Sequence, residues 1–231
     1  MTEPQFRAMG EAALLVDFGG GIDEATHRRV IALDHAIALE CGDGPLAAVA
    51  ETVPAYTCLM VRFDVDRTDH GALAEAISAL LSVTAHDAIT PREHIVPVCY
   101  DPAFAPDIEA VANRSGLSPT EVARRHADAS YRTYMYGFAP GYAYLGGVPK
   151  ALQLPRKADV VRGHPVGSVM IAGPQCLITT LDMPTGWWVI GRTPMPVFTP
   201  DAKEPFRFVP GDTIRFEAIH ADRFASWSEA V

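Results

Sequence analysis

The chain has 231 residues, of which 48% are hydrophobic and 20% are charged, and its formal net charge is −9. This composition is typical of a soluble globular protein with one large domain or two ordinary ones. The negative charge argues against nucleic acid or an anionic membrane surface as the main partner. Residues 1–4 hold neither a basic region nor an apolar signal core, and no apolar run is long enough to span a bilayer, so we expect a cytoplasmic protein.

The first 90 residues predict a small α+β domain. Four short apolar runs, bounded by glycine, proline or polar residues, are predicted to be strands: 6–9, 12–18, 49–53 and 57–65. Apolar side chains recur at helical spacing over 22–39 and from Asp69 to Leu81, which predicts two helices. The order β-β-α-β-β-α favours a sandwich in which both helices cover one face of a small mixed sheet.

The rest of the chain predicts a second, β-rich domain that opens with a strand at 94–100. Two short helices follow, one at 107–114 and one from the capping box at Ser118 to about His126. Beyond them, short apolar runs alternate with glycine and proline, which predicts an all-β barrel or sandwich with a short helix at 221–227. The expected strands are 166–172, 176–181, 187–190, 196–198 and 213–218.

The most distinctive segment is residues 134–147, Y-M-Y-G-F-A-P-G-Y-A-Y-L-G-G, which holds four tyrosines and four glycines. The glycines and the Pro-Gly pair allow tight turns, and the tyrosine rings are stiff and carry hydroxyls that need partners. From these residues alone, an aromatic-lined turn in a barrel wall and the wall of a ligand pocket both stay open. Three further glycine-rich motifs in the same domain favour the pocket if their turns converge on it.

Common catalytic, nucleotide and metal motifs are absent from the sequence. It contains no G-x-x-x-x-G-K-[ST] phosphate loop, no G-x-G-x-x-G and no G-x-S-x-G nucleophile elbow. The eight histidines lack metal-ligand spacing, so we expect no metal. The cysteines are far apart and form no C-x-x-C pair, so we expect buried thiols rather than disulfides: Cys41, Cys58, Cys99 and Cys176.

Four segments occur in one order along the second domain: G-F-A-P-G-Y-A-Y-L-G-G (137–147), L-P-R-K (154–157), G-S-V-M-I-A-G-P-Q (167–175) and G-W-W-V-I-G-R-T-P (186–194). Together they resemble the family of the 5-oxoprolinase B subunit, also called allophanate hydrolase subunit 1, which includes an inhibitor of a sporulation histidine kinase. The resemblance is strong from about residue 94 and weak before it. Departures from the family pattern, which leave the substrate open, include Met170, Cys176 and Thr185.

The resemblance implies a ferredoxin-like α/β sandwich over residues 1–90 and a cyclophilin-like β-barrel domain, carrying the site, over residues 91–231. It implies the B subunit of an ATP-dependent 5-oxoprolinase that opens the lactam of 5-oxoproline to L-glutamate. The implied partners are a C-subunit homologue, without which this chain is inactive, and a third subunit. The complex uses ATP, for which this chain shows no identifiable site. Two alternatives stay open: a carboxyltransferase-type subunit of an allophanate hydrolase or urea carboxylase system, and a protein inhibitor of a sensor histidine kinase.

Opening an amide calls for groups that bind small anions and stabilise developing oxygen charge. Arginine can hold a carboxylate or phosphate through two hydrogen bonds, glutamine both donates and accepts, and histidine exchanges a proton near neutral pH. The expected catalytic residues are therefore His126, Gln175 and Arg192. The expected substrate-binding residues are Tyr134, Phe138, Tyr142, Tyr144, Arg156 and Ser168. Structural roles also stay open, since His126 can favour the helix dipole and the arginines can brace turn carbonyls.

Overall fold

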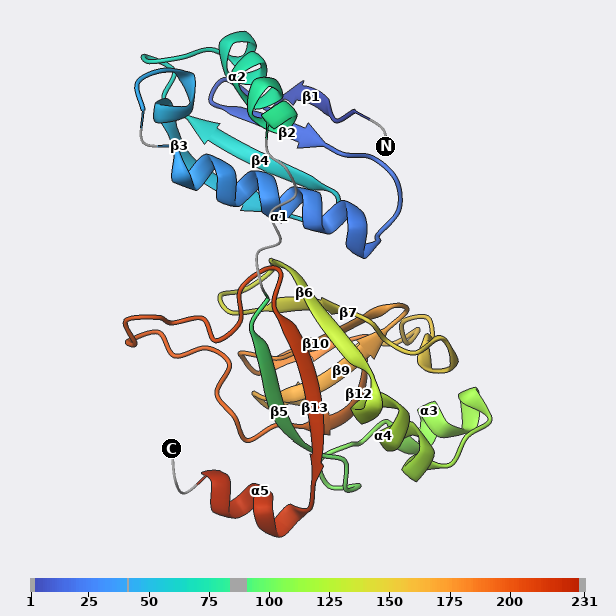
Figure 1. Cartoon of the computed structure of the whole chain (residues 1–231). Coiled ribbons are helices and arrows are strands. Elements are labelled where there is room, and N and C mark those ends of the chain that lie inside the picture. The colour runs from blue at the N-terminus through green and yellow to red at the C-terminus, as the bar shows by residue number, and fades with distance from the viewer. Residues whose placement is uncertain (1–2, 41, 84–90, 229–231) are drawn as a thin grey trace. The chain divides into compact units, whose positions relative to one another are not determined.

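The computed structural model describes residues 3–40, 42–83 and 91–228, and it divides the chain into two compact units, residues 1–90 and 91–231 (Figure 1). Each unit contains an apolar core of its own. Cys41 lies outside the described residues, and so does Thr90, the last residue of the first predicted domain. Within the described ranges, no helix is long and apolar enough to cross a membrane.

The first unit is a four-stranded sheet with two helices packed on one face (Figure 1). In the order of the sheet, the strands are β1 (Gln5–Ala8), β2 (Ala13–Asp17), β4 (Cys58–Phe63) and β3 (Val49–Pro54). The helices are α1 (Glu24–Leu39) and α2 (His70–Val83), and a 3₁₀ turn, η1 (Pro45–Ala48), precedes β3. Alternate residues of the two central strands point to the helices and form the core with them.

This arrangement confirms the predicted α+β class and corrects one detail of it. Helix α1 connects β2 to β3, and these two strands run parallel to each other, but β4 lies between them. All hydrogen-bonded neighbours are therefore antiparallel, and the expectation of a mixed sheet is wrong. The result is the split β-α-β pattern of ferredoxin-like domains, with the strand β1 placed first in the chain rather than last.

In the second unit, seven strands close into a barrel with the order β10-β7-β6-β13-β5-β12-β9 (Figure 1). The first and last of them in the chain, β5 and β13, pair in parallel, and every other neighbouring pair is antiparallel. This confirms the predicted barrel. Its strands are β5 (Glu93–Cys99), β6 (Ser130–Tyr136), β7 (Ala143–Gly146), β9 (Ser168–Ala172), β10 (Gln175–Ile178), β12 (Trp188–Arg192) and β13 (Thr213–Ile219).

Short helices and a two-stranded ribbon complete the second unit. The helices are α3 (Ile108–Ser115), α4 (Pro119–Asp128), α5 (Ala221–Ser228) and the 3₁₀ turn η2 (Lys150–Leu152). The ribbon pairs β8 (Val161–His164) with β11 (Met183–Thr185) and was not predicted. The strand predicted at 196–198 is wrong, because this segment is a loop that makes a single bridge, from Phe198 to Phe206.

The barrel wall is covered on both of its faces along β9, all five residues of which are buried. Val169 and Ile171 belong to the large core inside the barrel, to which all seven strands contribute. Met170 and Ala172 point the other way, into a smaller apolar cluster with Leu177 of β10. Because successive residues of a strand face opposite sides, this second cluster lies on the outer face of the barrel wall.

Candidate functional site

The aromatic segment 134–147 is a hairpin of the barrel wall, in which β6 and β7 are joined by the turn 137–142. Gly141 has φ +71°, and a Cβ atom added there would lie 2.5 Å from Cβ of Phe198, so only glycine fits. A Cβ atom at Gly146 would likewise lie 2.4 Å from the ring of Tyr134. The segment is therefore a turn in a barrel wall, and its rings cover the outer face of that wall.

Three rings and one arginine are in contact on the outer side of the barrel wall, and we call them the aromatic face: Tyr142, Tyr144, Trp187 and Arg156. Tyr142 and Trp187 are buried members of the outer cluster, whereas Tyr144 is partly exposed and Arg156 is exposed. The ring centroids of Tyr142 and Tyr144 lie 5.8 Å apart, and those of Tyr144 and Trp187 lie 6.2 Å apart, both edge to face. The Arg156 guanidinium lies 5.4 Å from the Trp187 ring. The structure thus brings together three of the residues expected from the sequence, with Trp187 as an added member.

The electrostatics of the aromatic face suit a small anionic ligand. The Arg156 side chain is exposed, and within the described part of the chain it makes no ion pair, so its planar fork is free to hold a carboxylate. The Tyr142 hydroxyl donates to Sδ of Met183 at 3.4 Å. Burial, and to a smaller extent Tyr144, raise the pKa of Tyr142 to about 12 against the opposing effect of Arg156, so this phenol stays protonated at neutral pH.

His164, at the end of β8, was missed by the sequence reasoning. It lies directly opposite Met183 of β11, so the two side chains share one face of the ribbon. Met183 packs against the outer cluster, and therefore His164 also faces the wall that carries the aromatic face. Its side chain is only 5% exposed, and its Nε2 is buried without a hydrogen-bond partner among the described residues. A lone histidine before Pro165 carries no motif that could have singled it out.

The charge state of His164 follows from its surroundings. Burial lowers the pKa of His164 below its ordinary value, and the nearby Lys157 ammonium lowers it further, against the opposing effect of Asp107 and Asp182. The ring is therefore neutral near pH 7, and a neutral imidazole has one nitrogen that can accept a hydrogen bond. A buried acceptor of this kind is rare unless it is satisfied by a ligand or by water.

Lys157, the last residue of the L-P-R-K motif, anchors the segment that carries Arg156. Its Nζ lies 2.7 Å from Oδ2 of Asp107, and the side chains are 10% and 17% exposed. The same carboxylate oxygen accepts from the backbone N–H of Val189 at 2.7 Å. Asp107 thus ties the motif to the barrel strand β12 and fixes the backbone next to Arg156.

The structure does not bring His126 to the aromatic face. The ring is completely buried and stacks at 4.6 Å on Phe216, a residue of the core inside the barrel. Its Nδ1 shares a 2.7 Å hydrogen bond with the Tyr100 hydroxyl, and its Nε2 lies 3.6 Å from Sγ of Cys176. Burial lowers the pKa of His126 to about 3, so the ring is neutral. His126 therefore belongs to the inner core, whereas Tyr142 lies on the outer face of the wall.

Arg192 and Ser168 lie together, next to the turn 165–167. They are partners in the register of β12 and β9. Arg192 Nε donates to the carbonyl of Val166 at 3.0 Å, and Ser168 Oγ donates to the carbonyl of Pro165 at 2.6 Å. Both side chains brace the turn that joins the ribbon to β9, which is the structural role left open for the arginine.

The remaining expected residues lie along the hairpin. Gln175 opens β10 opposite Gly146 of β7, and the Tyr134 ring packs against that same glycine. Gly146 and Tyr144 are two residues apart on one strand and so share its outer face. Tyr134 therefore continues the outer surface beside Tyr144. Phe138 lies at the tip of the hairpin, 5.3 Å from the Tyr142 ring, and its side chain is mostly exposed.

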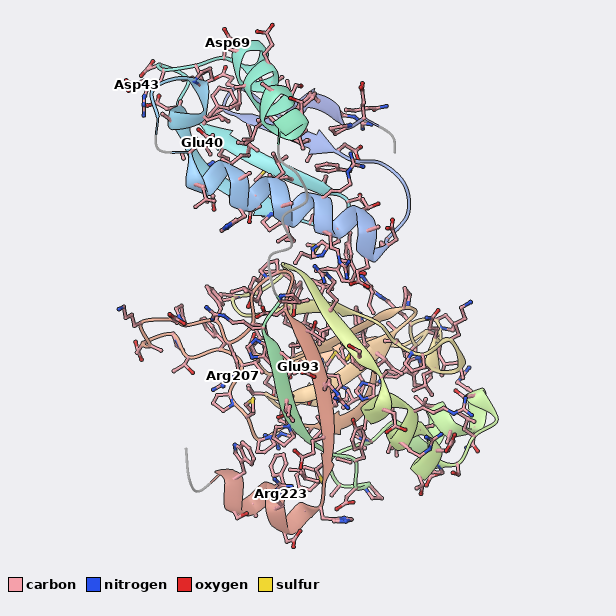
Figure 2. All side chains as sticks on the ribbon, viewed as in Figure 1. Glu40, Asp43, Asp69, Glu93, Arg207 and Arg223 are labelled. Carbon is pink, nitrogen blue, oxygen red and sulfur yellow. The ribbon has the colours of Figure 1, made fainter. Side chains whose placement is uncertain are left out.

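Two adjoining hollows lie in the first unit, with volumes of about 560 and 410 Å³, and they share Gly44 and Pro45. Acidic side chains line them, and Figure 2 shows Glu40, Asp43 and Asp69 gathered at this end of the unit. None of the motif residues reaches these hollows. We base the candidate site on the aromatic face, because it combines an exposed cation, edge-to-face rings and a buried histidine nitrogen without a partner among the described residues.

Comparison with known proteins agrees with the motifs. The family model described as "Carboxyltransferase domain, subdomain C and D" matches residues 4–208. The chain is 34% identical to the B subunit of 5-oxoprolinase from Bacillus subtilis over 97% of both chains, and 31% identical to that of Escherichia coli O157:H7 over 90% of this chain and 93% of the other. The crystal structure of TTHA0988 superposes with a TM-score of 0.79 at 32% identity, covering 91% of this chain and 40% of the longer one. The chain therefore belongs to the family of the 5-oxoprolinase B subunit.

Proposed function

We propose that the chain is the B subunit of an ATP-dependent 5-oxoprolinase, which opens the lactam of 5-oxoproline to L-glutamate together with a C-subunit homologue and a third subunit. The observation that carries this proposal is the 34% identity to the 5-oxoprolinase B subunit of Bacillus subtilis, which extends over 97% of both chains. An identity of this kind over the full length supports the same kind of subunit rather than a shared domain alone.

The aromatic face supports a ligand with the chemistry of 5-oxoproline, a small flat ring with one carboxylate and one amide. Arg156 is an exposed cation for the carboxylate, and the partly exposed ring of Tyr144 offers a flat surface for the lactam. His164 is neutral and can accept a hydrogen bond from the lactam N–H. This bond would be favourable, because Nε2 of His164 is buried without a partner among the described residues. These groups bind and orient the ligand, and Asp107 and Lys157 hold the segment that carries Arg156.

A lactam is a poor electrophile because its nitrogen shares electron density with the carbonyl. ATP would supply the phosphoryl group, and its transfer to the amide oxygen, with release of ADP, would overcome this resonance. The residues on this chain contribute orientation and exclusion of water, which are large effects when a reacting group must be held in one geometry.

Reconstitution tests the proposal. The chain is assayed alone, with its C-subunit homologue, and with the third subunit, and both ADP and L-glutamate are measured with 5-oxoproline as substrate. We expect stoichiometric formation of the two products only in the complete mixture. A complete mixture that leaves 5-oxoproline unchanged while ATP is present would show that the proposal is wrong.

The description of the matching family model favours a second candidate, a carboxyltransferase-type subunit. Such a subunit would accept a carboxyl group onto an amide such as urea, in a system that depends on a biotin carboxylase. The same purified complex, supplied with urea and a biotinylated carrier protein, distinguishes the two. Urea-dependent activity with no glutamate formed from 5-oxoproline would favour the second candidate.

A further inference from the structure

The tip of the aromatic hairpin carries a strained and exposed phenylalanine. Phe138 has φ +73° and is the only residue other than glycine with a positive φ within the described ranges. A bulky side chain rarely adopts this backbone conformation. The ring is 74% exposed, so its burial does not offset the strain. Glycine, which already occupies positions 137 and 141 on either side, would fit the turn better.

The turn holds this ring in a fixed place. Ala139 N–H donates to the carbonyl of Gly137 at 2.9 Å, and Tyr142 N–H donates to the carbonyl of Ala139 at 3.1 Å. The Thr180 hydroxyl donates to the carbonyl of Pro140 at 2.8 Å, which ties the tip to the segment before β11. The strain is therefore imposed by a well-bonded turn, which holds the backbone of Phe138 in place and exposes its ring at the tip of the hairpin.

Other exposed apolar side chains surround the tip. Leu181, next to Thr180, is 36% exposed, and Val166 is 50% exposed on the neighbouring turn. The two turns are joined by the hydrogen bond from Gly167 N–H to the carbonyl of Thr179, at 2.9 Å. We call Phe138, Val166 and Leu181 the tip surface. Exposed apolar side chains on turns that are bonded to one another, with an exposed aromatic among them, are typical of protein interfaces.

The residues next to the tip surface indicate which protein binds there. The Phe138 ring is 5.3 Å from that of Tyr142, so a protein seated on the tip surface borders the aromatic face directly. The relatives of this chain are named as B subunits, so a chain of this kind works with other subunits. Arg162 lies on β8, the strand that leads into the turn of Val166, and it is exposed and makes no ion pair among the described residues.

We propose that the tip surface is the docking site for the second subunit of the complex, whose apolar socket, flanked by a carboxylate, receives the Phe138 ring and faces Arg162. The inference rests on the proposed function for the identity of that subunit. Docking here covers one side of the aromatic face and excludes water from it. The strain at Phe138 is then retained because the ring serves binding rather than folding of the free chain.

Two variants of the full chain test the proposal, Phe138→Gly and Phe138→Asn. Both remove the ring, and both residues tolerate a positive φ. We expect the thermal midpoint of the free chain to stay the same or rise, while the Kd for the purified C-subunit homologue rises by about 10-fold or more. The matched control is Ile95→Ala, which removes another exposed apolar side chain from β5, a strand that is not adjacent to β7 in the barrel, and leaves the Kd unchanged.

Several outcomes overturn the proposal. A Kd for the C-subunit homologue that is unchanged in both variants would overturn it. A thermal midpoint lowered by several degrees would also overturn it, because the Phe138 ring would then stabilise the fold of the free chain. Failure of the wild-type chain to bind the C-subunit homologue would also overturn it. A dimer of the free chain that Phe138→Asn dissociates would assign the surface to a second copy instead. If assembly depends on Phe138 but the complex does not convert 5-oxoproline, the docking site is supported and the proposed function is wrong.

Discussion

The two units of this chain differ in charge as much as in fold. Residues 1–90 hold fourteen acidic side chains against five arginines and no lysine, whereas residues 91–231 hold fourteen of each sign. The whole net charge of −9 therefore lies in the first unit. Figure 2 illustrates the contrast, because the labelled residues of the first unit are all acidic, while those of the second are Glu93, Arg207 and Arg223.

The units also differ in how deeply their charged side chains are buried. The ion pairs of the first unit are exposed, as between Arg62 and Glu51. The second unit contains a largely buried ion pair, Lys157 with Asp107, and a hydrogen bond between His94 Nε2 and Asp212 Oδ2 at 2.8 Å. Exposed pairs contribute little to stability, whereas buried charges are costly when their partner is lost. The first unit therefore depends on its apolar core, and the second depends in addition on specific polar anchors next to the candidate site.

The largest expected effect follows from removing one of those anchors. Asp107→Ala leaves the Lys157 ammonium largely buried without its partner, and should lower the free energy of unfolding of the second unit by about 3–5 kcal/mol. All three tryptophans lie at 187, 188 and 227, so urea unfolding followed by tryptophan fluorescence reports this unit alone. The matched change in the first unit, Glu51→Ala, should cost at most about 1 kcal/mol. If the two substitutions lowered the free energy of unfolding equally, the two units would not differ in their dependence on ion pairs.

Acid should unfold the second unit through His126. The pKa of this ring is about 3 in the folded chain, below its unfolded value, so the unfolded state binds a proton first and stability falls as pH drops below about 6.5. We expect a loss on the order of 3 kcal/mol by pH 4. His126→Gln should flatten this dependence between pH 6.5 and 4, and His220→Gln, an exposed position, should not. A slope that is the same in all three proteins would contradict the burial of His126.

Arg156→Ala should weaken substrate binding without unfolding the chain. The exposed guanidinium contributes charge-assisted hydrogen bonds of about 1.5–3 kcal/mol, so KM for 5-oxoproline in the complete complex should rise about 10- to 100-fold. Arg215→Ala, on β13, is the control and should change KM less than about twofold. A double change of Glu40→Gln and Asp43→Asn should also leave KM unaltered. If instead it alters KM as much as Arg156→Ala does, the acidic unit takes part in binding.

Salt should produce the smallest effect, and it should act mainly on the first unit. Like charges in this unit repel one another, and added salt screens that repulsion. Raising the ionic strength from about 0.01 to 0.5 M should increase its stability by on the order of 0.5 kcal/mol. Hydrogen exchange of the α1 and β2 amides measures this, while tryptophan fluorescence should show a smaller change in the second unit. A larger gain in the second unit would reverse the comparison.

Much of the fold could be predicted because local and tertiary preferences agree. The predicted helix at 22–39 and the capping box at Ser118 match α1 and α4, where Ser118 Oγ accepts from the N–H of Glu121 at 3.2 Å. The ribbon could not be predicted, because its strands have four and three residues and contain Gly163 and Pro184. Such strands are stable only against a surface that the sequence does not reveal.

The candidate site was predictable only in part, for a related reason. Motif residues next to turns, such as Tyr142 and Arg156, do come together on the outer wall. His126 lies elsewhere because it is four residues after Val122 on α4, so both point into the core. That spacing was readable from the sequence. His164 was not, because its importance depends on the pairing of β8 with β11 and on a missing hydrogen-bond partner among the described residues.

The parallel pairing of β5 with β13 has a consequence for synthesis of the chain. These strands meet across about 120 residues of sequence, as the bond between Arg92 and Asp212 shows, and the barrel cannot close without both. The first unit can therefore fold on the ribosome, whereas the barrel cannot close until residue 219 has emerged. During that interval β5 is an open edge with an apolar face, and a chaperone that covers it should raise the yield of folded protein.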